Sequence, residues 1–138
     1  MAHVATLAMW AFAVAYSGAE LRDRLTHMID EATFRRVSDQ ALEKLKQSLI
    51  DAEEAGGFEA EEKNGVLNVL FEDGSAKFVF TPQTPVRQVW ISARTSSFKL
   101  EWDESSSHFK LVKTGEDLRG LTERLLREQL GDPTLQLA

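Results

Sequence analysis

The chain has 138 residues, no cysteine, 43% hydrophobic and 28% charged residues, and a formal net charge of −6. This length suits one domain with its own hydrophobic core, and the missing cysteine excludes disulfides, thiolate catalysis and any cysteine-held zinc or iron–sulfur cluster on this chain. Residues 30–62 contain ten acidic and four basic side chains, so this segment accounts for the whole net charge. Because phosphate contacts need clustered Lys and Arg, we expect no nucleic-acid partner, and a cation or a basic protein surface is favoured.

The first 27 residues are set apart from the fold prediction. Residues 4–16 form an apolar run of thirteen, which is shorter than the roughly 20 residues of a membrane span, so we expect no membrane association. The run has the length of a signal-peptide core, but no Lys or Arg precedes it. Two interpretations stay open: a signal-like segment, or a start placed too early, with the domain beginning at Met28. We therefore divide the chain into an N-terminal extension (1–27), a domain (28–133) and a tail (134–138).

A helix is predicted over residues 30–52, where apolar side chains recur at helical spacing and acidic residues stand near the beginning. The apolar stripe comprises Phe34, Val37, Ala41, Leu42, Leu45 and Leu49. Gly56 and Gly57 end this helix.

Short alternating segments predict strands after the first helix. The strands expected are residues 66–71, 77–80, 88–92, 98–102 and 109–112, and residues 59–62 lead into them. Asp73-Gly74 predicts a tight turn, because glycine accommodates positive φ. Short polar turns between strands are typical of an antiparallel meander.

A second helix is predicted from about Glu116 to Leu130, with Thr114-x-x-Asp117 as a loose capping box and Gly131 at its end. The order of helix, strands and helix predicts an α+β fold. We expect a two-layer α/β sandwich, in which an antiparallel sheet of about five to six strands carries the N- and C-terminal helices on one face.

Alternation assigns the strand residues to two faces. The helix-covered face takes Leu67, Val69, Phe71, Phe78, Phe80, Val89, Ile91 and the aromatic residues of 98–102. The face open to water takes Asn68, Gln88, Trp90 and Ser92. A Trp between Gln and Ser on an exposed face is typical of an interface anchor. The alternative is a register shifted by one residue, or a loop that covers the ring.

No catalytic constellation is recognisable in the sequence. The histidines His3, His27 and His108 are scattered, and there is no Gly-rich phosphate loop and no His-x-x-x-His pair. We therefore predict no catalytic residue.

Acidic residues gather where the first helix ends and the strands begin. Asp51, Glu53 and Glu54 close the helix, and Glu59 and Glu61 point the same way if their segment is extended. Oxygen donors alone favour hard cations such as Mg²⁺, Ca²⁺, Mn²⁺ and iron. The alternative is a solvated acidic face that keeps the protein in solution.

Three segments together resemble the frataxin family in its bacterial form: GVLNVLFEDGS (65–75), QTPVRQVWIS (83–92) and FKLEWD (98–103). The family's Gln-x-Pro-x-x-Gln-x-Trp pattern is matched by Gln83, Pro85, Gln88 and Trp90. The similarity covers residues 29–131 and implies an α–β-sheet–α fold. It departs at Lys46 and Gln47, which stand where acidic residues are common in the family.

The resemblance implies a protein that binds iron (Fe²⁺ or Fe³⁺) weakly through carboxylates. It would act in iron–sulfur cluster assembly as an iron chaperone or a regulator of the cysteine desulfurase–scaffold complex, and it would hold no cluster of its own. The metal-binding residues carried over are Asp51, Glu53, Glu54, Glu59 and Glu61, with Glu43, Asp30 and Glu31 as outlying candidates. The partner-binding residues carried over are Asn68, Gln83, Gln88 and Trp90.

Two other functions stay open from the sequence. One is a ferroxidase, an iron-detoxifying enzyme, although the Glu-x-x-His motifs of di-iron helix bundles are absent. The other is a plain interaction domain whose acidic face has no function. For a protein of iron–sulfur cluster assembly we expect a cytoplasmic monomer, with iron-dependent oligomers as an alternative.

Overall fold

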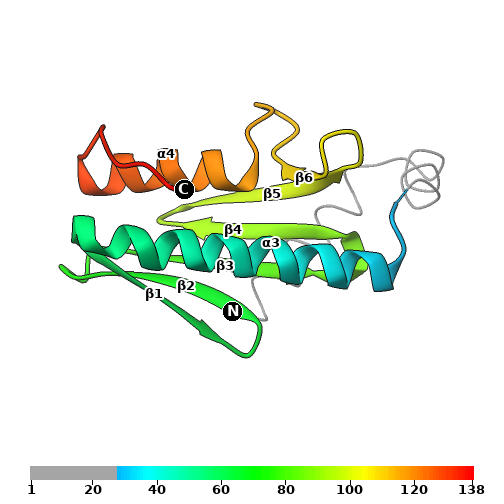
Figure 1. Ribbon diagram of the computed structural model, residues 1–138, viewed down its shortest axis with the longest axis horizontal. Coiled ribbons are helices and arrows are strands. Elements are labelled where there is room, and N and C mark those ends of the chain that lie inside the picture. Colours follow the sequence, from blue (N-terminus) through cyan, green and yellow to red (C-terminus); the bar gives the residue numbers. More distant parts are fainter. Residues whose placement is uncertain (1–27) are drawn as a thin grey trace. The chain divides into compact units, whose positions relative to one another are not determined.

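The computed structural model describes residues 28–138, and the predicted N-terminal extension lies outside the described residues. Residues 31–138 form a compact unit in which a long helix is followed by six strands and a second helix (Figure 1). The elements are α3 (Glu31–Ala52), the 3-10 turn η1 (Glu53–Ala55), β1 (Phe58–Lys63), β2 (Val66–Phe71), β3 (Lys77–Gln83), the 3-10 turn η2 (Thr84–Val86), β4 (Gln88–Ala93), β5 (Ser96–Asp103), β6 (His108–Lys110) and α4 (Leu118–Leu130).

The six strands form one antiparallel sheet whose spatial order follows the chain. α3 and α4 lie side by side over the same face of this sheet (Figure 1). We call this covered face the inner face and the opposite one the outer face. The predicted α+β two-layer sandwich is confirmed.

The inner face carries the core, as the alternation predicts. Its strand residues are each at most 6% exposed: Leu67, Val69, Phe71, Phe78, Phe80, Val89 and Ile91. Phe98 and Trp102 lie on the same face but are only half-buried. Because β6 has three residues and pairs only with the end of β5, no described strand pairs with β5 beside Phe98 on that side.

α3 also contributes to the core, through the predicted stripe. Its buried residues are Phe34, Val37, Ser38, Leu42, Leu45 and Leu49, whereas Ala41 is half-buried. The chain then turns through η1 to Gly57, whose φ is 98° and where an added Cβ would lie 2.7 Å from Cδ2 of Leu130. Glycine there therefore lets the turn approach the end of α4 closely.

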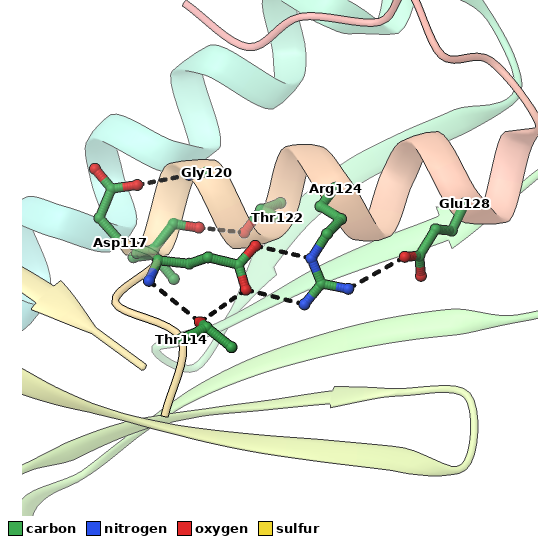
Figure 2. A network of polar contacts seen from close by, with 8 residues as sticks. Thr114, Asp117, Gly120, Thr122, Arg124 and Glu128 are labelled. Atoms are coloured by element: carbon green, nitrogen blue, oxygen red, sulfur yellow. Dashed lines mark hydrogen bonds and ion pairs between the residues drawn. The ribbon is translucent and has the colours of Figure 1, made fainter. Parts of the chain in front are cut away.

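The beginning of α4 corrects one sequence prediction. Asp117 is the N-cap, since its Oδ1 accepts the backbone N–H of Gly120 at 2.7 Å (Figure 2). The hydroxyl of Thr114 instead accepts the N–H of Glu116 at 3.2 Å within the preceding loop. The capping box at Thr114 is wrong because this loop bond satisfies the threonine locally.

An ion-pair network fastens that loop onto α4. The guanidinium of Arg124 donates to the carboxylate of Glu116 at 2.8 and 3.0 Å and to Glu128 at 3.1 Å (Figure 2). Its hydrogen bonds to Glu116 raise the pKa of Arg124 and lower the pKa of that carboxyl below its usual value. The pair therefore stays charged at neutral pH and holds the loop on the helix.

The segment predicted as a tail runs back from α4 toward α3 (Figure 1). Leu135 and Leu137 are only 4% and 3% exposed. Within residues 28–138, no helix combines the length and hydropathy that crossing a bilayer requires.

Candidate functional site

Five of the predicted metal ligands follow one another around the end of α3 and along β1. Asp51 lies in the last turn of α3, Glu53 and Glu54 form η1, and Glu59 and Glu61 lie on β1. We call these five residues the acidic ridge. In the part of the chain that the structure describes, β1 is an edge strand of the sheet, and Glu59 and Glu61 of the ridge lie along it.

The predicted orientation of the β1 carboxylates is confirmed by the register. Glu59 lies opposite Leu70, and Glu61 lies opposite Asn68, so both glutamates belong to the outer face. Both are exposed. Two carboxylates two residues apart on one strand face lie close enough to share a hydrated cation.

One residue of the ridge, Asp51, interacts unfavourably with the dipole of α3. The last turn of α3 contains no basic residue, and Asp51 stands at the end where the dipole is negative. An acidic group there costs about 0.3–1 kcal/mol, whereas a cation would be stabilised. Helix stability alone therefore does not account for Asp51, and a bound cation or a basic partner would offset its cost.

Glu53 differs from the rest of the ridge. Its Oε1 accepts the backbone N–H of Ala60 at 2.8 Å, and the side chain is half-buried. This bond links η1 to β1. Glu53 is thus partly engaged in the fold, whereas Glu54, Glu59 and Glu61 are exposed.

The outlying candidates do not join the ridge. Glu31 and Asp51 are twenty residues apart on one helix, which separates them by about 30 Å. Glu31 pairs with Arg35 at 3.4 Å, and Asp30 directly precedes α3. Among the described residues, no group of three or more His, Cys, Asp or Glu side chains is placed to hold one ion.

Lys46 of α3 lies beside Glu43, the third outlying candidate, and reaches across to β1. Its Nζ lies 3.5 Å from Oε2 of Glu43 and 3.4 Å from Oε2 of Glu62. The charge of Glu43 raises the pKa of Lys46 above its ordinary value. Glu43 therefore already has a cationic partner in Lys46.

The hairpin that precedes Trp90 is longer than predicted. β3 continues to Gln83, and Pro82 lies beyond Phe80, where the pairing of β3 with β2 has ended. A proline is tolerated there because the β2 ladder loses no hydrogen bond. Pro85 lies in η2, the turn that connects β3 to Gln88 at the start of β4.

The predicted docking residues lie on the outer face, as expected. Trp90 is half-exposed and lies opposite Thr81 on β3 and Lys99 on β5. Asn68 and Gln83 are also half-exposed. Since the helices lie on the other face, the register shift that would have placed the Trp90 ring in the core is excluded.

The predicted exposure of Gln88 is wrong. It was expected to face water, but it is only 2% exposed. Its Oε1 accepts the indole N–H of Trp90 at 2.8 Å, and its Nε2 donates to Oε2 of Glu101 at 3.3 Å. Alternation predicted the correct face but could not predict that neighbours on that face would cover the amide.

Two residues of this surface were missed by the sequence reasoning. Lys99 places its Nζ 5.1 Å from the centre of the Trp90 ring, within reach of a cation–π interaction. Glu101 is the cross-strand neighbour of Gln88. The signal was available in the alternation of Lys99 and Glu101 with the apolar residues of β5, which puts both on the outer face.

The fold and these features define a small two-layer α+β protein with an acidic edge and a Trp-centred sheet face. A frataxin-like domain model matches residues 27–132. The chain belongs to the frataxin-like family.

Named relatives match over most of their length. The iron-sulfur cluster assembly protein CyaY of Pseudomonas fluorescens (strain Pf0-1) is 33% identical over 103 residues, which cover 75% of this chain and 91% of that protein. The protein of the same name from Azotobacter vinelandii is 32% identical over 106 residues, with coverage of 75% and 92%.

A solved structure shares the fold. The frataxin of Psychromonas ingrahamii superposes with a TM-score of 0.66 at 14% sequence identity, and the match covers 79% of this chain and 96% of that one. At this identity the comparison supports the architecture alone.

Proposed function

We propose that the protein takes part in iron–sulfur cluster assembly in the cytoplasm, as an iron chaperone or a regulator of the cysteine desulfurase–scaffold complex. CyaY relatives that carry this process in their names match over nine-tenths of their length. The observation that carries the proposal on this chain is the incompletely buried Trp90, which lies on the outer face with its indole bonded to Gln88 and its ring beside Lys99. A large, rigid ring with polar neighbours suits a protein-docking anchor.

Iron is the cargo in this proposal, and the acidic ridge would hold it. Its carboxylate oxygens suit a hard cation, and exposed side chains leave room for water to complete the coordination. The same negative edge would attract a basic surface of the desulfurase. Binding of the purified chain to the desulfurase–scaffold complex, measured with and without Fe²⁺, tests the proposal, and no binding in either condition would contradict it.

Anaerobic titration with Fe²⁺ is expected to perturb the amide NMR signals of residues 51–61 most strongly. Signals near Glu31 should change least, because that end of α3 is about 30 Å away. Replacing Glu54 and Glu59 by Gln should reduce the perturbation, since an uncharged amide is a weaker ligand of nearly the same shape. The control is Asp39→Asn, an exposed acid of α3 outside the ridge. Equal perturbation in both variants would exclude the ridge as the iron site.

Reversing the charge of Glu54 and Glu59 to Lys should slow association with the desulfurase–scaffold complex by roughly tenfold or more at low salt. The loss should shrink as salt screens the charges. Glu53 is left intact because it binds the β1 backbone. A charge-matched control replaces Asp39 and Glu104 by Lys, since both are exposed and lie outside the ridge. If the control slows association equally, net charge matters and the ridge does not.

A further inference from the structure

We propose that Gln88 is a positioning residue that fixes the orientation of the Trp90 indole, and that Glu101 in turn fixes Gln88. The inference rests on the docking role proposed for the outer face. Gln88 and Trp90 lie two residues apart on β4 and share that face. Because Gln88 is 2% exposed and Trp90 is half-exposed, a partner resting on this face can touch the ring but hardly reaches the amide.

The chemistry of the three groups determines which way the amide points. An indole N–H only donates, an ionised carboxylate only accepts, and the Gln88 amide does both from opposite ends. Its oxygen meets the Trp90 Nε1 at 2.8 Å, and its nitrogen meets the Glu101 Oε2 at 3.3 Å. In a flipped amide, the NH₂ group would face the indole N–H, which also donates. The amide oxygen would face the carboxylate, which also accepts. Glu101 therefore directs the oxygen of Gln88 toward the indole.

Two residues of β5 therefore influence the orientation of the Trp90 ring. Lys99 approaches the ring directly, with its Nζ 5.1 Å from the ring centre, and Glu101 acts through Gln88. A side chain held in one orientation before binding loses less conformational freedom when a partner docks. The consequence is a docking anchor whose orientation depends on Gln88, which a partner hardly reaches.

The first test is Gln88→Met, which keeps the approximate length of the side chain but removes the acceptor. In ¹H–¹⁵N spectra, the Trp90 indole N–H should shift and exchange with solvent about tenfold faster or more, since a net hydrogen bond is lost. Affinity for the desulfurase–scaffold complex should fall by about tenfold. An indole N–H with wild-type shift and exchange in folded Gln88→Met would overturn the inference.

The second test exchanges the polar groups. In Gln88→Glu combined with Glu101→Gln, a carboxylate at position 88 can accept from both the indole and the new amide, so slow indole exchange and affinity should return. Gln88→Glu alone places two carboxylates in contact, so this variant should show faster indole exchange and weaker affinity than the double variant. If Gln88→Met does not fold, the double exchange decides: fast indole exchange in the folded double variant contradicts the proposal.

A third measurement separates positioning from direct contact. Combined with Trp90→Ala, Gln88→Met should cause little further loss of affinity, because no ring is left to orient. An equal further loss would mean that Gln88 itself contacts the partner and would overturn the inference. If the wild-type chain does not bind the complex at all, the proposed function fails, while the indole exchange still tests the orientation.

Discussion

Replacing Trp90 by alanine is expected to weaken binding to the desulfurase–scaffold complex by about 2 kcal/mol or more, as for an interface hot spot. That is a loss of roughly 30-fold in Kd. The fold should survive, because the neighbouring core residues of β4, Val89 and Ile91, point to the inner face and are 0% exposed. Removing the ring also admits water to Gln88, so no polar group is left buried and unpaired.

The control is Trp102→Ala, since Trp102 is on the inner face with its ring centre 5.1 Å from that of Phe109. This change should lower the free energy of unfolding and leave the affinity of the folded protein unchanged. Calorimetric titration and urea unfolding of both variants measure the two effects separately. A Trp90→Ala protein that is strongly destabilised but binds normally would show that the ring serves the fold.

The fold was largely predictable because its elements are periodic. The stripe of α3 and the alternation of β2 and β4 each repeat over several residues, so one misjudged residue does not change the assignment. The same alternation assigned Trp90 to the outer face, with a register shifted by one residue as the alternative, and the structure confirms the assignment. These features depend on local spacing, which the sequence displays directly.

Features that depend on contacts between distant segments were not predictable in this way. Gln88 is buried by neighbours on its own face, and alternation carries no information about such cover. The bond of Glu53 to the Ala60 N–H depends on how η1 turns back on β1. Leu135 and Leu137 alternate over too few residues to indicate a packed segment.

That C-terminal segment is tied to both helices. Four hydrogen bonds join its backbone groups to side chains of the two helices: Leu135 O with Arg127 Nε (2.7 Å), Leu137 O with Arg119 Nη1 (2.9 Å), Leu137 N with Glu123 Oε2 (2.9 Å), and Ala138 O with Ser48 Oγ (2.7 Å). Three of these partners lie on α4, and Ser48 lies on α3. The segment therefore joins the two helices through polar and apolar contacts together.

Replacing both Leu135 and Leu137 by alanine is expected to lower the free energy of unfolding by about 3–5 kcal/mol. Each buried Leu→Ala change costs about 2–5 kcal/mol, and a terminal segment can relax into part of the space. This is a large share of the roughly 5–15 kcal/mol that stabilises a typical domain, and it should lower the urea midpoint by roughly 2 M. Gln136→Ala, at the exposed position between them, is the control and should unfold like the wild type. An unchanged midpoint in the double variant would mean that this segment unfolds independently of the helices it contacts.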